Sequence, residues 1–216
     1  MVTSPVTAPA LAFSVLDAAP VERAAAPTLA FSVQVVAPGG EAIRSVLLDV
    51  QLQIAARRRR YEAEAHERLL ELFGPVKDWG TTLHSLLWTR TTLVVPPFTG
   101  STVAELPVPC TYDTEVLASK YLDALPGGDV PLELLFSGTV FYAGASGQLQ
   151  ASRISWEQEA EYQLPVRVWR ATMERHFPGT AWLRLPKESF DRLCAYKARN
   201  AFASWEQALD ELLGER

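Results

Sequence analysis

The stretch IRSVLLDVQLQIA, from Ile43 to Ala55, decides the fold class. Its large apolar side chains fall on alternate positions, and polar side chains stand between them. Successive residues of a strand point to opposite faces of a sheet, so this strand has one apolar and one polar face. Strands of parallel sheets are usually buried on both faces, whereas antiparallel sheets often keep one face in water. The stretch therefore predicts an antiparallel sheet.

Further strands are predicted on both sides of this one. They cover the two copies of LAFSV that begin at Leu11 and Leu29, and the segments RTTLVVPPF, TVAELPVPCTY, VPLELLFSGTVFY and LQASRISW. Pro107 and Pro109 stand two positions apart in one of these segments. Proline lacks the backbone N–H that a neighbouring strand would need, and this spacing puts both gaps on the same side. That segment is predicted to be an edge strand.

Helical patterns are short among the strands and dominate the last third of the chain. An apolar stripe follows the arginines, and a short helix is predicted over residues 114–125 with Asp113 as its N-cap. Beyond Gln163, helices are predicted over VRVWRATMERHF, KESFDRLCAYKARNAF and WEQALDELL, the last of them capped by Ser204. The predicted fold class is α+β: an antiparallel β-sandwich or sheet with short inserted helices and a helical C-terminal third packed on it.

Length and composition fit a single globular domain over residues 1–216. We expect about residues 10–160 to be mainly β and about residues 165–214 to be helical. Apolar residues make up 48% of the chain and charged residues 21%, which is a globular profile. Cys110 and Cys194 are too few for a disulfide framework, which favours the reducing cytoplasm. The N-terminal stretch lacks the basic start of a signal peptide, and no apolar run is long enough for a membrane span, so no membrane partner is expected.

Motifs that would carry catalysis or hold a cofactor are incomplete. His66-Glu67 resembles the start of a zinc-protease helix, but Leu70 occupies the position of the second histidine. Cys110 has no neighbouring His or cation that would lower its thiol pKa, which favours a packing role. No nucleotide-binding glycine motif and no Cys-x-x-Cys pair is present. We therefore expect no catalytic residue, no metal and no cofactor.

The run Arg57, Arg58, Arg59 and Arg60, followed by Tyr61, is the one candidate binding site. Arginine forks grip carboxylates and phosphates, but charge runs are more often solvated. The formal net charge of the chain is −5, and Tyr61 is the one aromatic residue beside the run, so no nucleic-acid partner is expected. We predict a local charged patch beside the sheet, partly neutralised by the acidic residues that follow it. If the patch binds, its expected partner is an acidic protein surface.

Four segments together resemble a known family. They are RRRRY, LLWTRTTLVVPPFTGSTVAELPVPCTYDTEVLASKYLDAL, VPLELLFSGTVFY and LPVRVWRATMERHFPGTAWLRL. They resemble an uncharacterised, mainly actinobacterial family, domain of unknown function 6084, over nearly the whole chain from about Leu11. The resemblance carries over no catalytic residues. Genes of the family often neighbour those of nickel–iron uptake hydrogenases, so the resemblance implies an accessory or assembly role.

The function predicted from these observations is a non-enzymatic accessory protein that binds another protein through its sheet face or edge. Two other readings stay open. One is an enzyme with an unfamiliar site that uses Cys110, Tyr112 or Asp113. The other is a carrier of a small apolar ligand inside the sandwich.

Overall fold

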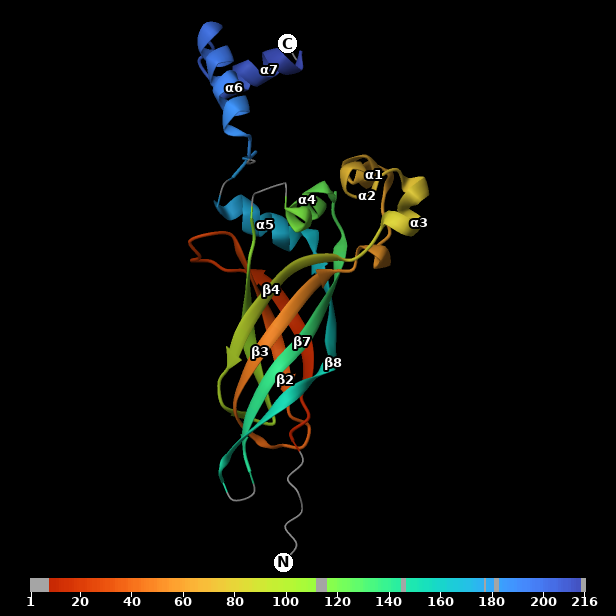
Figure 1. Ribbon diagram of the computed structural model, residues 1–216, viewed down its shortest axis with the longest axis vertical. Helices are drawn as coiled ribbons and strands as arrows, with labels where there is room; N and C mark the ends of the chain where they lie inside the picture. Colours follow the sequence, from red (N-terminus) through yellow and green to blue (C-terminus); the bar gives the residue numbers. More distant parts are fainter. Residues whose placement is uncertain (1–7, 112–115, 145–146, 177, 181–182, 215–216) are drawn as a thin grey trace, which may run out of the picture. The chain divides into compact units, whose positions relative to one another are not determined.

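The computed structural model describes residues 8–111, 116–144, 147–176, 178–180 and 183–214 (Figure 1). Its contacts divide the chain into two compact units, residues 1–181 and residues 182–216. The first unit holds the strands that the structure describes, and the second holds two helices. We predicted a single domain over residues 1–216, in which the two units would unfold together, and this stays a prediction.

Two antiparallel sheets make up most of the first unit (Figure 1). One has the strand order β1-β2-β6 and the other the order β4-β3-β7-β8, with the short β5 paired to β3. The strands are β1 (Ala12–Pro20), β2 (Thr28–Val36), β3 (Ala42–Ile54), β4 (Leu86–Val95), β5 (Phe98–Thr99), β6 (Ser101–Pro109), β7 (Asp129–Ala143) and β8 (Leu149–Pro165).

The alternation that predicted the sheet is confirmed in β3. Val46, Leu48 and Leu52 are fully buried, whereas Asp49 on the opposite face is exposed. The buried faces of both sheets contribute to one apolar core. Phe13 of β1 stacks on Phe136 of β7 with 4.5 Å between ring centroids. Burial of such large side chains is the main favourable term in folding. The α+β fold class is therefore confirmed.

The edge strands of the sheets are candidate binding surfaces, and one of them, β8, also contacts β1 of the other sheet. In the described chain β6 pairs only with β2, and Pro107 and Pro109 stand opposite Ala30 and Thr28, as the proline spacing predicted. β8 pairs only with β7 in the same described region, so it is also an edge. It continues well beyond Trp156, where the predicted strand ended, to Pro165.

Short helices between β3 and β4, after β6 and after β8 cover one end of the first unit (Figure 1). They are the 3-10 helices η1 (Ala56–Arg58) and η2 (Val76–Asp78) and the α-helices α1 (Ala63–Arg68), α2 (Leu70–Phe73), α3 (Trp79–Thr82), α4 (Leu117–Ala124) and α5 (Val166–His176). Helix α5 contacts β1, β2 and β8, and its Trp169 is 5% exposed within the core. The predicted packing of C-terminal helix on sheet thus applies to α5. None of the helices described is both long and apolar enough to cross a membrane.

The second unit consists of α6 (Lys187–Arg199) and α7 (Trp205–Leu213). The two helices form a hairpin in which Phe190 of α6 contacts Trp205 of α7, with 6.2 Å between ring centroids. The N-cap predicted at Ser204 is confirmed, because its hydroxyl oxygen accepts a hydrogen bond of 3.2 Å from the backbone N–H of Gln207.

Candidate functional site

The arginine run lies where the chain leaves the core at the end of β3. Ala55 and Ala56 are still buried, and η1 then turns the chain toward α1. The Nε of Arg57 donates a hydrogen bond to the backbone carbonyl oxygen of Leu83, just before β4 begins. This arginine therefore joins the exit of β3 to the entry of β4.

Arg58 is held by two glutamates on neighbouring strands. Its guanidinium lies 2.8 Å from Glu133 of β7 and 2.5 Å from Glu161 of β8, and these two residues are cross-strand partners. The hydrogen bond to Glu161 and the charge of Glu133 raise the pKa of Arg58. We expected the acidic residues of the following helix to neutralise the run. Instead, no ion pair in the described part of the chain joins it to Glu62, Glu64 or Glu67, and the partners of Arg58 are Glu133 and Glu161.

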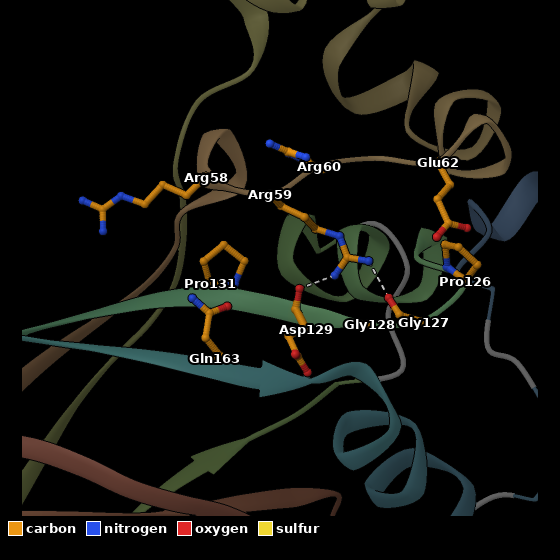
Figure 2. A pocket seen from close by; sticks show the side chains of 10 residues that line it. All are labelled: Arg58, Arg59, Arg60, Glu62, Pro126, Gly127, Gly128, Asp129, Pro131 and Gln163. Atoms are coloured by element: carbon orange, nitrogen blue, oxygen red, sulfur yellow. Dashed lines mark hydrogen bonds between the residues drawn. The ribbon is translucent and has the colours of Figure 1, made fainter.

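Arg59 fastens the loop that leads into β7. Its guanidinium donates hydrogen bonds to the backbone carbonyl oxygens of Gly127 and Asp129 (Figure 2). Gly128 lies between them with a φ of +75°, and a Cβ there would stand 3.3 Å from the guanidinium. The Nε of Arg59 is buried without a hydrogen-bond partner. Glycine at 128 thus leaves room for the arginine, which acts as a clamp on this loop.

Tyr61 belongs to the same structural network. Its hydroxyl donates to the carbonyl oxygen of Ala56 at 2.7 Å and lies 2.8 Å from the hydroxyl of Tyr121. Because Tyr61 has only one hydroxyl proton, Tyr121 is the donor in the second bond. Its ring also meets Trp79 edge to face, 5.1 Å between centroids. Tyr61 therefore ties the arginine run to α4.

Arg60 is the member of the run with no hydrogen bond or ion pair to any described residue. With Arg58 and Arg59 it lines a pocket of about 470 Å³, which also includes Glu62 and Asp129 (Figure 2). Mixed charges give this pocket no strong preference for an anion. The structure brings the five predicted site residues together but engages four of them internally. Ligand binding by the run stays a prediction that rests mainly on Arg60.

The residues of the enzymatic reading are only partly described. Cys110 is buried at the end of β6, and burial raises the pKa of its thiol to about 12. A thiol with that pKa is protonated and a poor nucleophile at neutral pH. Tyr112 and Asp113 lie outside the described residues. Within the described ranges, no three His, Cys, Asp or Glu side chains gather in a way that could hold a metal ion.

The edge of β8 presents a surface that the sequence did not predict. Trp156 is 82% exposed and lies in an irregularity where the pairing of β7 with β8 shifts between Phe136 and Gly138. Glu157, Glu159 and Glu161 follow at alternate, exposed positions. Large exposed aromatic residues are rare, because tryptophan is highly buried on average. The sequence signal that could have revealed this edge was the alternation of polar residues with Ala160, Tyr162 and Leu164 after Trp156, which is typical of a continuing strand.

Residues 8–216 match the sequence profile of DUF6084, described as a family of unknown function. No curated protein matches the chain.

Solved structures show only slight similarity. A protein described as late embryogenesis abundant is 14% identical, with a TM-score of 0.31 and 73% of each chain covered. A protein described as ApaA from Bordetella pertussis is 15% identical, with a TM-score of 0.24, 74% of this chain covered and 96% of that one. β-Glucosidase 3B from Thermotoga neapolitana is 12% identical, with a TM-score of 0.25, 72% of this chain covered and 17% of that one. These similarities are too slight to support a function.

Proposed function

The chain belongs to DUF6084, a family of unknown function, and we propose that it is a non-enzymatic accessory protein that binds an extended segment of another protein along the edge of β8. Trp156, 82% exposed on this edge, is the observation that carries the proposal. Tryptophan is among the residues that contribute most to binding energy when a partner buries them. An exposed edge strand offers unpaired backbone N–H and C=O groups that a second strand can satisfy.

Charge favours a basic partner segment. Glu157 and Glu159 are exposed beside Trp156 and have no ion pair in the described chain, whereas Glu161 is already paired with Arg58. Side chains at alternate positions of a strand share one face, so these carboxylates lie in a row. Lysine or arginine side chains at alternate positions of the partner would face them. The acidic partner predicted for the arginine run is therefore replaced in our proposal by a basic one on β8.

A nickel–iron hydrogenase or one of its assembly factors, which the family resemblance implies as partner, stays a prediction. It rests on gene neighbourhood and on no residue of this chain. The proposal of protein binding along β8 does not depend on it.

The experiment is affinity capture from the native host with chemical cross-linking, comparing the unchanged protein, Trp156→Ala and Val94→Ala. Val94 is the matched control, because it is 66% exposed on β4, the opposite edge of the same sheet. We expect a stoichiometric partner to be captured by the unchanged protein and by Val94→Ala, and to be lost with Trp156→Ala. A variant that carries Glu157→Lys and Glu159→Lys but keeps Trp156 should capture no partner at low salt.

Hydrogen exchange on the purified complex locates the contact. Binding along the edge should slow exchange of β8 amides, whereas amides at the β6 edge should keep their rates. Equal capture by Trp156→Ala and Val94→Ala, or protection confined to other strands, would contradict the proposal.

A further inference from the structure

The helical hairpin of α6 and α7 is too small to bury its own apolar side chains. Among its described residues only Ala208 is fully buried, and α6 has no buried residue at all. Leu209, Leu212 and Leu213 of α7 are 44%, 53% and 71% exposed. Segments below roughly 40 residues seldom have enough core to be stable without a further constraint such as oligomerisation. The hairpin therefore has an apolar surface that another surface must cover.

One side of the hairpin is a basic groove with an apolar floor. It has a volume of about 560 Å³ and is lined by Arg192, Leu193, Tyr196 and Arg199 of α6 and by Leu212 of α7, among others. Arg192 and Arg199 are exposed and form no ion pair with any described residue. Lys197, in contrast, is used inside the hairpin, where it donates to the carbonyl oxygen of Phe202 at 2.9 Å.

The opposite charge lies on the other helix of the same hairpin. Helix α7 carries three acidic side chains and no basic one, and Glu206, Asp210 and Glu211 are all exposed. Helix α6 carries four basic and two acidic side chains. Lys187 pairs with Asp191 within α6, but no ion pair among the described residues joins α6 to α7, so Arg192 and Arg199 stay unpaired with the acidic side chains of α7. A single chain thus carries two complementary surfaces. One is an acidic ridge on α7, formed by Leu209 and Leu213 with Asp210 and Glu211, and the other is the basic groove with an apolar floor.

From this complementarity we propose that the hairpin associates with the hairpin of a second copy of this chain. In a two-fold arrangement the exposed Leu209 and Leu213 of each copy lie in the basic groove of the other, whose apolar floor includes Leu212. Such an interface is self-complementary, because every contact occurs twice. Four helices then surround one apolar centre, as in a four-helix bundle. This association uses no residue of β8 and stands independently of the proposed protein-binding edge.

The test measures the mass of the full-length protein by sedimentation velocity over a range of protein concentrations. The chain has a mass of 23.8 kDa, and we expect a concentration-dependent dimer of twice that mass. Arg192→Glu with Arg199→Glu should make the protein monomeric, and so should Asp210→Lys with Glu211→Lys. Lysine is tolerated at these last two positions, because cations are favoured near a helix C-terminus.

Mixing the two charge-reversed proteins should restore a dimer, since acidic grooves then meet basic ridges. A restored dimer would show that each variant is folded and had lost only its charge pairing. Circular dichroism of each variant checks its helix content independently. The matched control is Arg44→Glu with Arg153→Glu, which makes the same charge change at exposed positions of the sheets and should leave the dimer intact. A monomeric native protein, a dimer that survives both reversals, or a mixture that stays monomeric would each overturn the proposal.

Discussion

The hydrogen bond between Tyr61 and Tyr121 is sensitive to removal of either hydroxyl, but unequally. Tyr121 is fully buried and donates to Tyr61, which in turn donates to Ala56. Tyr61→Phe leaves the Tyr121 hydroxyl without an acceptor, so it should lower the free energy of unfolding by about 1–3 kcal/mol. Tyr121→Phe leaves the bond to Ala56 intact and should lower it by about 1 kcal/mol.

Urea unfolding of both single variants and the double variant measures the coupling. The double variant should lose less than the sum of the two single losses, because each change removes the same bond. Strictly additive losses would contradict a hydrogen bond between the two tyrosines, and equal single losses would contradict the assignment of Tyr121 as its donor.

These tyrosines also predict an alkaline loss of stability. Burial is the main cause that raises the pKa of both Tyr61 and Tyr121. A tyrosine in the unfolded chain ionises near about pH 10. Since the folded-state pKa values are higher, the stabilising contribution is complete below about pH 10 and is lost as pH rises through the folded values.

The free energy of unfolding should therefore fall above about pH 10, and it should fall less steeply in the Tyr61→Phe, Tyr121→Phe double variant. Cys110, whose pKa burial raises to about 12, acts in the same direction in both proteins, so their difference isolates the pair. Parallel pH curves for the two proteins would show that the pair does not contribute.

Arg59 and Arg60 are neighbours with different roles. Arg59→Gln removes charged hydrogen bonds to the carbonyl oxygens of Gly127 and Asp129, and it should destabilise the protein by about 1–3 kcal/mol. Arg60→Gln is its control and should change stability by less than about 0.5 kcal/mol. Chemical denaturation distinguishes them, and equal effects would mean that Arg59 is not a clamp.

The position of the arginine run at the end of a strand could be predicted, but the partners of the run could not. Glu133 and Glu161 pair with Arg58 across long sequence distances that only the sheet register brings together. In the sequence alone, the acidic residues that directly follow the run were the nearest candidates for ion pairs with it. Trp156 was missed for a related reason: tryptophan is usually buried, and its exposure depends on an irregular strand pairing.

At the scale of the strand, Gly138 is a position that no other residue fits. It lies within β7 with a φ of +138°, and a Cβ there would stand 2.1 Å from the carbonyl oxygen of Leu47 in β3. Gly138→Ala should lower the free energy of unfolding by about 3 kcal/mol or more, because both the backbone conformation and the neighbouring strand oppose it. At this chain length the melting temperature should fall by about 6 °C or more.

Gly127→Ala is the matched control, because nothing lies within 4 Å of a Cβ at that position. Thermal unfolding should leave Gly127→Ala close to the unchanged protein. Similar melting temperatures for the two variants would contradict the close contact between β7 and β3.

The strands were predictable where apolar alternation was strong. Ile43–Ala55 shows this, and so does the proline spacing that identified β6 as an edge. The second half of β8 was missed, although Ala160, Tyr162 and Leu164 alternate with polar residues there. Its glutamate, glutamine and alanine residues are good helix formers, and this local preference hid the period of two. Pairing with β7 overrides the preference.

At the scale of the molecule, charge distinguishes a protein partner from a nucleic-acid partner. The net charge of −5 and the carboxylates along β8 favour a basic protein segment over a polyanion. The absence of a nucleic-acid partner stays a prediction. A weak contact of Arg60 with phosphate would fall steeply with added salt, whereas the proposed contact of Trp156 is apolar and should persist.

The two compact units lead to a last prediction. All members of the apolar core cluster lie between Leu11 and Met173, so a chain that ends at Thr180 keeps every one of them. Its free energy of unfolding should differ from that of the full chain by less than about 1 kcal/mol. The truncated chain should also be monomeric, because it lacks both the groove and the ridge of the hairpin.

Scanning calorimetry of the truncated and full chains tests this at low protein concentration, where dimerisation adds little to the melting temperature. We expect one transition for the truncated chain and a melting temperature within about 4 °C of the sheet transition in the full chain. Removal of residues 181–216 deletes α6 and α7 but no member of the apolar core cluster, so the cooperative unit is expected to be the two sheets with α5. A truncated chain that fails to fold would instead support the single domain predicted from length and composition, and would mean that the hairpin stabilises the sheets.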